Sequence, residues 1–390
     1  MNQDIPQTGF EPSEFALRTE RAQRLMRKLD VDGLLLTTEP EVRYFSGFYT
    51  AFWLSPTRPW FLVVPREGKP IAVIPEIGGA RMSETWLDDI VVWPAPRPND
   101  EGITELTATI KRLKKMSGVI GVPMGPESHI RMPFSDFKKF QENIRGIQLV
   151  DATPLIQELR KIKSEAEVSK IRYICQRVSE GFLELPKIAN LGDKEKEVFR
   201  KFRIDLLARG ADEVPYLVGG SGPSGPTEVI GMPSNRILTK GDMLMMDTGA
   251  VFDGYFSDFD RNFCFGSVDE TVAAAYDLVY RATDAGLEAA RPGITAEGLW
   301  KVMADVLSES TPSKNAVGRL GHGLGMQLTE YPSNMKGDKT PMLPGMVMTL
   351  EPSIEFADGR IMVHEENILI RDGEPELLSI RAPSEIPLIY

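Results

Sequence analysis

The chain contains few cysteines and histidines, the side chains that form disulfides and most zinc sites. Its 390 residues include two cysteines and three histidines. Cys175 and Cys264 lie far apart and neither belongs to a Cys-x-x-Cys pair, which argues against a zinc knuckle or a dithiol redox motif. The two thiols could pair in an oxidising compartment, but we expect buried thiols in a reducing one.

Acidic residues outnumber basic ones, and long apolar runs are scarce. The net charge of −11 argues against a nucleic-acid partner, which favours a basic surface. The longest apolar runs, such as residues 60–64 and 243–246, are far shorter than the ~20 residues of a membrane-spanning helix. Residues 1–15 lack the basic and apolar regions of a signal peptide. We therefore expect a cytoplasmic protein that binds neither membranes nor nucleic acids.

The length of the chain and its first half predict two domains, the first of α/β type. A chain of 390 residues is long for one hydrophobic core. Helical spacing over residues 14–29 and 103–116 alternates with short apolar segments, and the segments expected to be strands are 32–38, 61–65, 71–75, 90–93 and 118–122. Segments 61–65 and 71–75 flank a turn-like tetrapeptide and predict a hairpin. The first domain, with a mixed sheet, is placed at residues 1–155.

The second half has a different pattern, with blocks of helix separated by short strands and many glycines and prolines. Helices are expected at residues 154–162, 165–188, 194–209, 272–290 and 295–308. Ser164 is a candidate N-cap for the second of these, with Glu165 and Glu167 in its first turn. This arrangement predicts the α+β class for the whole chain and a second domain over residues 156–390.

The most specific signal in the second half is a series of five side chains that can bind metal. In chain order they are Asp247, Asp258, His322, Glu351 and Glu365. Each lies in a short segment that is typical of a strand or a tight turn. Four carboxylates and one imidazole suit one or two hard or borderline divalent cations. This set predicts a metal-dependent enzyme.

The first two of these residues are separated by eleven positions, with Gly254 between them. An odd separation along one strand would direct Asp247 and Asp258 to opposite faces. A hairpin or bulge within residues 249–254, between strands at 244–247 and 255–263, can bring both carboxylates to one point. The alternative is that Asp247 caps a strand end and Asp258 is a turn residue.

The other three residues lie in contexts that fit a metal site. His322 is flanked by Gly321 and Gly323, which leave room for a metal or substrate to approach the imidazole. Glu351 follows an apolar run and precedes a proline, at an expected strand end. Glu365 lies in an apolar strand, where a charged side chain needs a partner or a metal.

The order and local strings of these residues resemble the pita-bread metallohydrolases, peptidase family M24. Within that family they look like the branch of prolidase, aminopeptidase P and creatinase. The similar strings, in order, are DTGA from Asp247, GYFSD ending at Asp258, GHG around His322, TLEPSI around Glu351 and EE from Glu365. The resemblance covers most of the chain. It implies a creatinase-like N-terminal domain and a pita-bread C-terminal catalytic domain.

The resemblance also implies a chemistry for the five residues. They would hold two divalent ions, with Asp258 and Glu365 bridging both. Water between the ions would become hydroxide and attack an amide carbonyl. Glu351 and His322 would be the catalytic residues, Glu351 as the proton acceptor. Carboxylate-rich ligation favours Mn²⁺, Fe²⁺ or Co²⁺, with Zn²⁺ also compatible.

The chain departs from the peptidases of this family at residues that would shape the substrate pocket. Thr329, followed by Glu330, and Ile230 stand where prolidases carry histidines, and Asp260 stands where most relatives carry threonine. Three interpretations therefore stay open. The main one is an Xaa-Pro dipeptidase-like hydrolase. The others are a creatinase-like hydrolase or lyase on a guanidino or osmolyte-type substrate, and a non-catalytic binding protein.

An aromatic segment in the first domain adds an expectation about assembly. Residues 49–60 contain two tryptophans, Trp53 among them, and Arg58. In dimeric relatives the N-terminal domain of one subunit overhangs the other's active site, so the resemblance implies a homodimer. Trp53 and Arg58 could then close a small pocket around a carboxylate or a cationic group. The alternative is a hydrophobic loop that packs against its own domain.

Overall fold

The computed structural model describes residues 5–56, 58–113, 117–309, 318–357 and 359–390. These residues form two compact units, one of residues 7–160 and one of residues 161–390 with the segment 5–6. The boundary predicted at 155/156 lies inside helix α6 (Thr153–Arg160). The apolar residues Leu155, Ile156 and Leu159 of this helix are buried, and α6 packs on α1 of the first unit. The whole helix therefore belongs to the first unit.

The first unit is built on a mixed sheet, as predicted. Its strand order is β4 (Asp89–Trp93), β3 (Ile71–Pro75), β2 (Phe61–Pro65), β1 (Gly33–Leu36), β5 (Val119–Val122) and β6 (Gln148–Asp151). The pairs β1–β2 and β2–β3 are antiparallel and the other neighbours are parallel. The hairpin predicted at 61–65 and 71–75 is thus confirmed as β2–β3.

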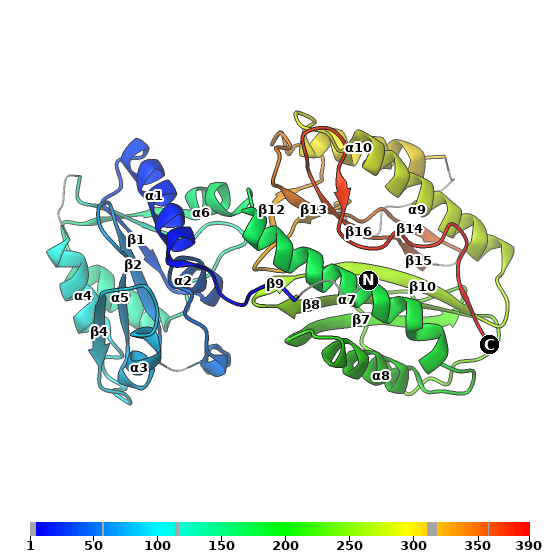
Figure 1. Ribbon diagram of the computed structural model, residues 1–390, viewed down its shortest axis with the longest axis horizontal. Coiled ribbons are helices and arrows are strands. Elements are labelled where there is room, and N and C mark those ends of the chain that lie inside the picture. Colours follow the sequence, from blue (N-terminus) through cyan, green and yellow to red (C-terminus); the bar gives the residue numbers. More distant parts are fainter. Residues whose placement is uncertain (1–4, 57, 114–116, 310–317, 358) are drawn as a thin grey trace. The chain divides into compact units, whose positions relative to one another are not determined.

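Helices cover both faces of this sheet (Figure 1). Helices α4 (Ile103–Arg112) and α5 (Phe134–Asn143) lie on one face, and α1 (Pro12–Lys28) and α2 (Glu39–Ser46) on the other. The short elements are η1 (Ala51–Leu54), η2 (Glu76–Gly78) and α3 (Gly79–Met82). The helix predicted at 103–116 corresponds to α4, and residues 114–116 lie outside the described residues. Apolar side chains of α4, α5 and the strands form one core.

The second unit contains the long helices that were predicted. They are α7 (Glu165–Ile188), α8 (Glu195–Ala208), α9 (Glu270–Ala289) and α10 (Ala296–Leu307). Ser164 caps α7 as predicted: its hydroxyl accepts from Glu167 N at 3.3 Å and the Glu167 carboxylate accepts from Ser164 N at 2.8 Å. Such a reciprocal pair satisfies two amides of the first helical turn.

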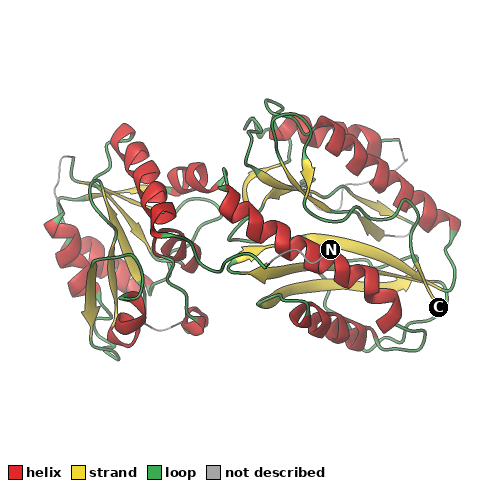
Figure 2. Ribbon diagram, in the orientation of Figure 1, coloured by secondary structure: helices red, strands yellow, loops and turns green. Residues whose placement is uncertain are grey.

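The predicted metal ligands lie in, or directly next to, strands of two sheets of the second unit. The first has the order β18 (Leu388–Ile389), β10 (Phe259–Phe265), β8 (Asp242–Phe252) and β7 (Glu213–Pro223), with β9 (Tyr255–Phe256) paired to β8. The second has the order β12 (Glu330–Ser333), β11 (His322–Gly323), β13 (Val347–Leu350), β16 (Glu366–Leu369) and β17 (Glu376–Leu377), and β14 (Ser353–Phe356) pairs with β15 (Arg360–Val363). Helices α7 and α8 contact the first of these sheets, and α9 contacts strands β13, β14 and β15 (Figures 1 and 2).

Both cysteines are buried and unpaired, as expected. The thiol of Cys175 lies 3.2 Å from Asn367 Oδ1, and burial raises the pKa of this thiol well above its usual value. Of the helices that the structure describes, none combines the length and apolarity needed to cross a bilayer.

Candidate metal centre

The β8–β10 hairpin explains why two of the predicted ligands are eleven positions apart. Its turn is formed by Asp253 and Gly254, whose φ angles of 47° and 81° fit a two-residue hairpin turn. In this register Asp247 pairs directly with Asp260 on the neighbouring strand. Asp258 precedes Asp260 by two positions and so lies on the same face, diagonally next to Asp247. The predicted hairpin is confirmed.

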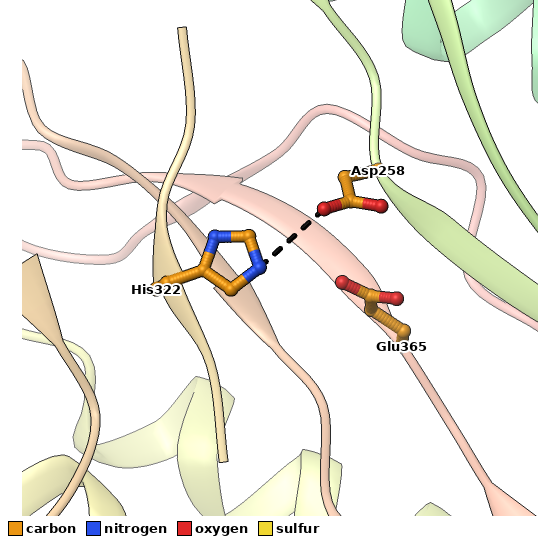
Figure 3. Close-up of side chains that lie close together, drawn as sticks. All are labelled: Asp258, His322 and Glu365. Atoms are coloured by element: carbon orange, nitrogen blue, oxygen red, sulfur yellow. Dashed lines mark ion pairs between the residues drawn. The ribbon is translucent and has the colours of Figure 1, made fainter. Parts of the chain in front are cut away.

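Three of the predicted ligands converge from separate segments of the second unit. Figure 3 shows the polar ends of Asp258, His322 and Glu365 turned toward one another. One ligand atom of each lies within 4.8 Å of the others, and all three residues are buried. The His322 Nε2 atom is 3.4 Å from Asp258 Oδ2. One cation could contact all three side chains.

The remaining two predicted ligands lie beside this group. Glu351 follows strand β13, and its Oε1 atom is 3.6 Å from His322 Nε2. Asp247 is close enough that its charge raises the pKa values of Asp258 and Glu365, after the larger effect of their burial. The structure therefore brings all five side chains into one cluster.

The imidazole of His322 is held with one nitrogen toward the cluster. Its Nδ1 atom lies 2.9 Å from the carbonyl oxygen of Gly323, to which a protonated Nδ1 donates. Nε2, on the cluster side, is then the lone-pair nitrogen that can bind a cation. The φ of Gly321 is 132°, and a Cβ there would lie 2.2 Å from Thr349 O. Glycine is therefore required where the chain enters the site.

Asn367 fixes the backbone of Asp258. Its Oδ1 atom accepts a hydrogen bond from Asp258 N at 2.9 Å, and its Nδ2 group donates to Asp258 O. Asn367 follows Glu365 by two positions on strand β16, so one side chain ties together the segments of two predicted ligands. Such supporting hydrogen bonds set the geometry of ligand carboxylates.

The carboxylates of the cluster fit a group of divalent cations. Among the residues that the structure describes, the buried oxygens without a hydrogen-bond partner include one atom each of Asp247, Asp260, Glu351 and Glu365. Buried acceptors are normally satisfied, and like charges packed together repel. Cations bound between these oxygens would satisfy both requirements.

The ionisation of the cluster follows from its burial and its crowding. Burial is the main cause that raises the pKa of Asp247 to about 6 and that of Glu351 to about 8. Burial also raises the pKa of Asp260 well above its usual range, and the charge of Asp247 adds to the effect. Burial and then the charge of Arg319 lower the pKa of His322 to about 4. The imidazole is therefore neutral at pH 7, as a metal ligand must be.

One basic residue at the cluster, Arg319, was not predicted from the sequence. Its Nε atom lies 3.8 Å from Glu351 Oε1, and its Nη2 group donates to Thr329 Oγ1 at 3.2 Å. Its charge lowers the pKa values of Asp258 and Glu351, against the larger effect of burial. The available signal was a basic residue three positions before His322, in a glycine-rich string.

The residues predicted to shape the substrate pocket lie in different environments. Asp260 is buried in the cluster and accepts from Asn262 Nδ2 at 2.9 Å. Thr329 is half-buried beside Arg319, and Ile230 is 72% exposed. Glu330 is buried and its carboxylate lies 3.1 Å from Lys163 Nζ, in an ion pair that joins β12 to the start of the second unit.

The aromatic segment of the first unit packs within that unit. The Trp53 side chain is buried, with its ring 5.9 Å from that of Trp60 and 5.0 Å from the Arg131 guanidinium. The Arg58 guanidinium lies 5.2 Å from the ring of Phe52. These contacts match the alternative of a loop that packs on its own domain. A role of Trp53 and Arg58 at a substrate pocket stays a prediction.

The fold and the carboxylate–histidine cluster are those of a metal-dependent hydrolase, and comparison with family models agrees. Residues 169–372 match metallopeptidase family M24, and residues 18–162 match the creatinase/prolidase N-terminal domain. The first match covers more than half of the chain, so this chain belongs to metallopeptidase family M24.

Two relatives that match this chain over nearly their whole length are described as dipeptidases. A protein of Mycobacterium tuberculosis described as a probable dipeptidase PepE is 27% identical over 381 residues, which cover 97% of this chain and 98% of the relative. An Xaa-Pro dipeptidase of Pyrococcus horikoshii is 26% identical over 369 residues, 92% of this chain and 96% of that protein.

Solved structures give the same result. The dipeptidase PepE of Mycobacterium ulcerans superimposes with a TM-score of 0.85 at 25% identity, over 98% of this chain and 99% of that one. A prolidase of Thermococcus sibiricus gives a TM-score of 0.86 at 25% identity, over 96% and 99% of the two chains. The predicted two-domain fold and the predicted M24-type hydrolase are confirmed. The hydrolase interpretation thus holds over the lyase and the non-catalytic alternatives.

Proposed function

We propose that this protein hydrolyses the amide bond of a dipeptide, with Xaa-Pro dipeptides as the preferred class. Two divalent cations would be held by Asp247, Asp258, His322, Glu351 and Glu365. The observation that supports this most is the cluster itself, in which buried carboxylate oxygens without hydrogen bonds surround a neutral imidazole. The descriptions of the full-length relatives support the choice of substrate class.

The residues of the cluster would divide the work of amide hydrolysis. Bound cations would polarise the amide carbonyl and acidify a nearby water. Glu351 would accept the water's proton; its side chain is 16% exposed, whereas those of Asp258 and His322 are 7% and 4% exposed, which supports this choice. Asn367 and the glycines beside His322 would keep the ligands in position.

The composition of the cluster also supports a choice of metal. One imidazole and several carboxylates favour Mn²⁺, Fe²⁺ or Co²⁺, and Zn²⁺ is also compatible. We propose manganese as the first metal to test. We further propose a cytoplasmic homodimer, as expected from the family resemblance, in which Trp53 and Arg58 help to close the substrate pocket.

The test combines metal analysis with a substrate panel. The wild-type protein should contain roughly two equivalents of divalent metal and cleave an Xaa-Pro dipeptide. Asp258→Ala should lose metal and activity together. Asp305→Asn is the matched control, since that carboxylate is exposed and pairs with Lys301 on helix α10. Cleavage of none of the dipeptides by metal-loaded protein would refute the proposed substrate class, and an active protein without metal would refute the mechanism.

A further inference from the structure

Arg319 lies at the edge of the metal centre, between the buried carboxylates and solvent. Its side chain is 30% exposed, whereas that of Glu351, 3.8 Å away, is 16% exposed. Its Nη2 group donates a hydrogen bond to the Thr329 hydroxyl at 3.2 Å.

The backbone next to Arg319 ties it to the metal centre. Leu320 N donates to Asn334 O at 2.8 Å, and Leu320 O accepts from Glu351 N at 3.3 Å. Leu320 itself is fully buried. The residue after Arg319 is therefore hydrogen-bonded through its backbone to Glu351, which holds the main chain of the two residues close together.

Two buried cations of this unit, Arg261 and Lys163, pair with carboxylates outside the five predicted ligands. Arg261 Nη2 lies 2.9 Å from Glu366 Oε2, and Lys163 Nζ lies 3.1 Å from Glu330 Oε2. For Arg319, a carboxylate in ion-pair range of its Nε atom belongs to Glu351, a predicted metal ligand. Its positive charge therefore lies beside the cluster in which the reaction would occur.

We propose that Arg319 is a further catalytic residue, which stabilises negative charge on the carbonyl oxygen of the substrate. This inference rests on the proposed amide hydrolysis. In that step the water oxygen bonds to the carbonyl carbon, the electron pair of the C=O bond moves to the oxygen that faces Arg319, and the water's proton passes to Glu351. The C–N bond then breaks, and the proton leaves with the amine. A guanidinium provides rigid, charged donors for such an oxyanion.

The first test compares Arg319→Gln and Arg319→Lys with the wild type, all loaded with Mn²⁺. Removing one oxyanion donor commonly lowers kcat ~10²–10³-fold, and Arg319→Gln should show a loss of this size with a smaller change in KM. Arg319→Lys should keep part of the rate because it keeps the charge. Added methylguanidine should restore part of the activity of Arg319→Ala, an effect that a purely structural role would not produce.

Two controls separate this role from others. Arg281→Gln removes an exposed arginine of helix α9 that pairs with Asp277, and it should leave kcat unchanged. Thr329→Val removes the hydroxyl that accepts from Arg319 and should lower kcat less than Arg319→Gln does. Loss of bound metal in Arg319→Gln, or a rise in KM with kcat unchanged, would overturn the proposal.

A binding measurement keeps the proposal testable if no dipeptide is cleaved. In that case the proposed function fails, but the metal-loaded protein can still be titrated with inorganic phosphate by calorimetry. Arg319→Gln should bind phosphate about tenfold or more weakly than the wild type, because a charge-assisted hydrogen bond is lost. Equal affinities would refute an anion-binding role of Arg319. If the wild type cleaves dipeptides and the Arg319 variants cleave them at the same rate, the role of Arg319 is refuted and the proposed function stands.

Discussion

Removal of the metal ions should give this protein a distinctive dependence of stability on pH. Without metal, burial raises the pKa of Asp247 to about 6 and that of Glu351 to about 8. In the unfolded chain such groups titrate near pH 4. The folded state therefore binds their protons more tightly than the unfolded state does. This contribution to stability is complete below the unfolded pKa and is lost as the pH rises through the folded pKa.

The size of the effect follows from these pKa values. One pKa unit corresponds to about 1.4 kcal/mol, so ionising both carboxyls should lower the unfolding free energy of the metal-free protein by on the order of 5 kcal/mol between pH 4 and pH 8. Burial also raises the pKa values of Asp258 and Glu365, which acts in the same direction. Bound cations need ionised ligands, so the metal-loaded protein should gain stability relative to the metal-free protein as the pH rises.

The assay is thermal unfolding of metal-free and Mn²⁺-loaded protein at a series of pH values from 5 to 8. The difference in Tm between the two forms should grow with pH by about 10 °C, since 1 kcal/mol shifts Tm by roughly 2–4 °C for a unit of this size. Glu351→Gln should flatten the trend for the metal-free protein, because it removes the carboxyl whose pKa is raised to about 8. A difference in Tm that stays constant or shrinks as the pH rises would refute this reasoning.

Three further predictions concern basic residues. Arg261→Lys should lower the free energy of unfolding by about 3 kcal/mol and weaken metal binding, because Arg261 donates to both Glu366 and the backbone of a predicted ligand. Urea unfolding and metal titration measure the two effects, and unchanged values would contradict this prediction. Lys163→Met should lower the free energy of unfolding, measured in urea, by about 3–5 kcal/mol, because it leaves the buried carboxylate of Glu330 without its lysine. The double variant with Glu330→Gln should recover most of this loss. Arg58→Ala should raise KM with metal content unchanged, and equal KM values would rule out its substrate role.

The hairpin ligands could be predicted because their relation is local. A two-residue turn at Asp253 and Gly254 fixes which residues face each other, so the eleven-residue spacing of Asp247 and Asp258 becomes a diagonal pair on one face. The helices were predictable for a similar reason. The capping pattern of Ser164 acts within one turn of helix α7.

The contacts that hold the centre together could not be predicted, because they join residues far apart in the chain. The hydrogen bonds between Asn367 and Asp258 span 109 positions, and the ion pair of Lys163 with Glu330 spans 167. Pattern analysis identified Glu330 as a pocket residue because of its neighbourhood in the sequence. Its partner depends on how strand β12 meets the segment before α7, which periodicity does not specify.

The charge balance of the centre involves Asp260, which was singled out from the sequence, and two arginines, Arg261 and Arg319. Asp260 faces Asp247 across the hairpin and adds a fifth carboxylate to the four predicted ligands. Two divalent cations would offset four negative charges, so a fully ionised centre would keep one in excess. The charge of Arg261 lowers the pKa of Asp260 against the larger effect of burial, and the charge of Arg319 does the same for Asp258 and Glu351. The two arginines therefore divide the charge balance of the centre, Arg261 acting on the additional carboxylate and Arg319 on two of the predicted ligands.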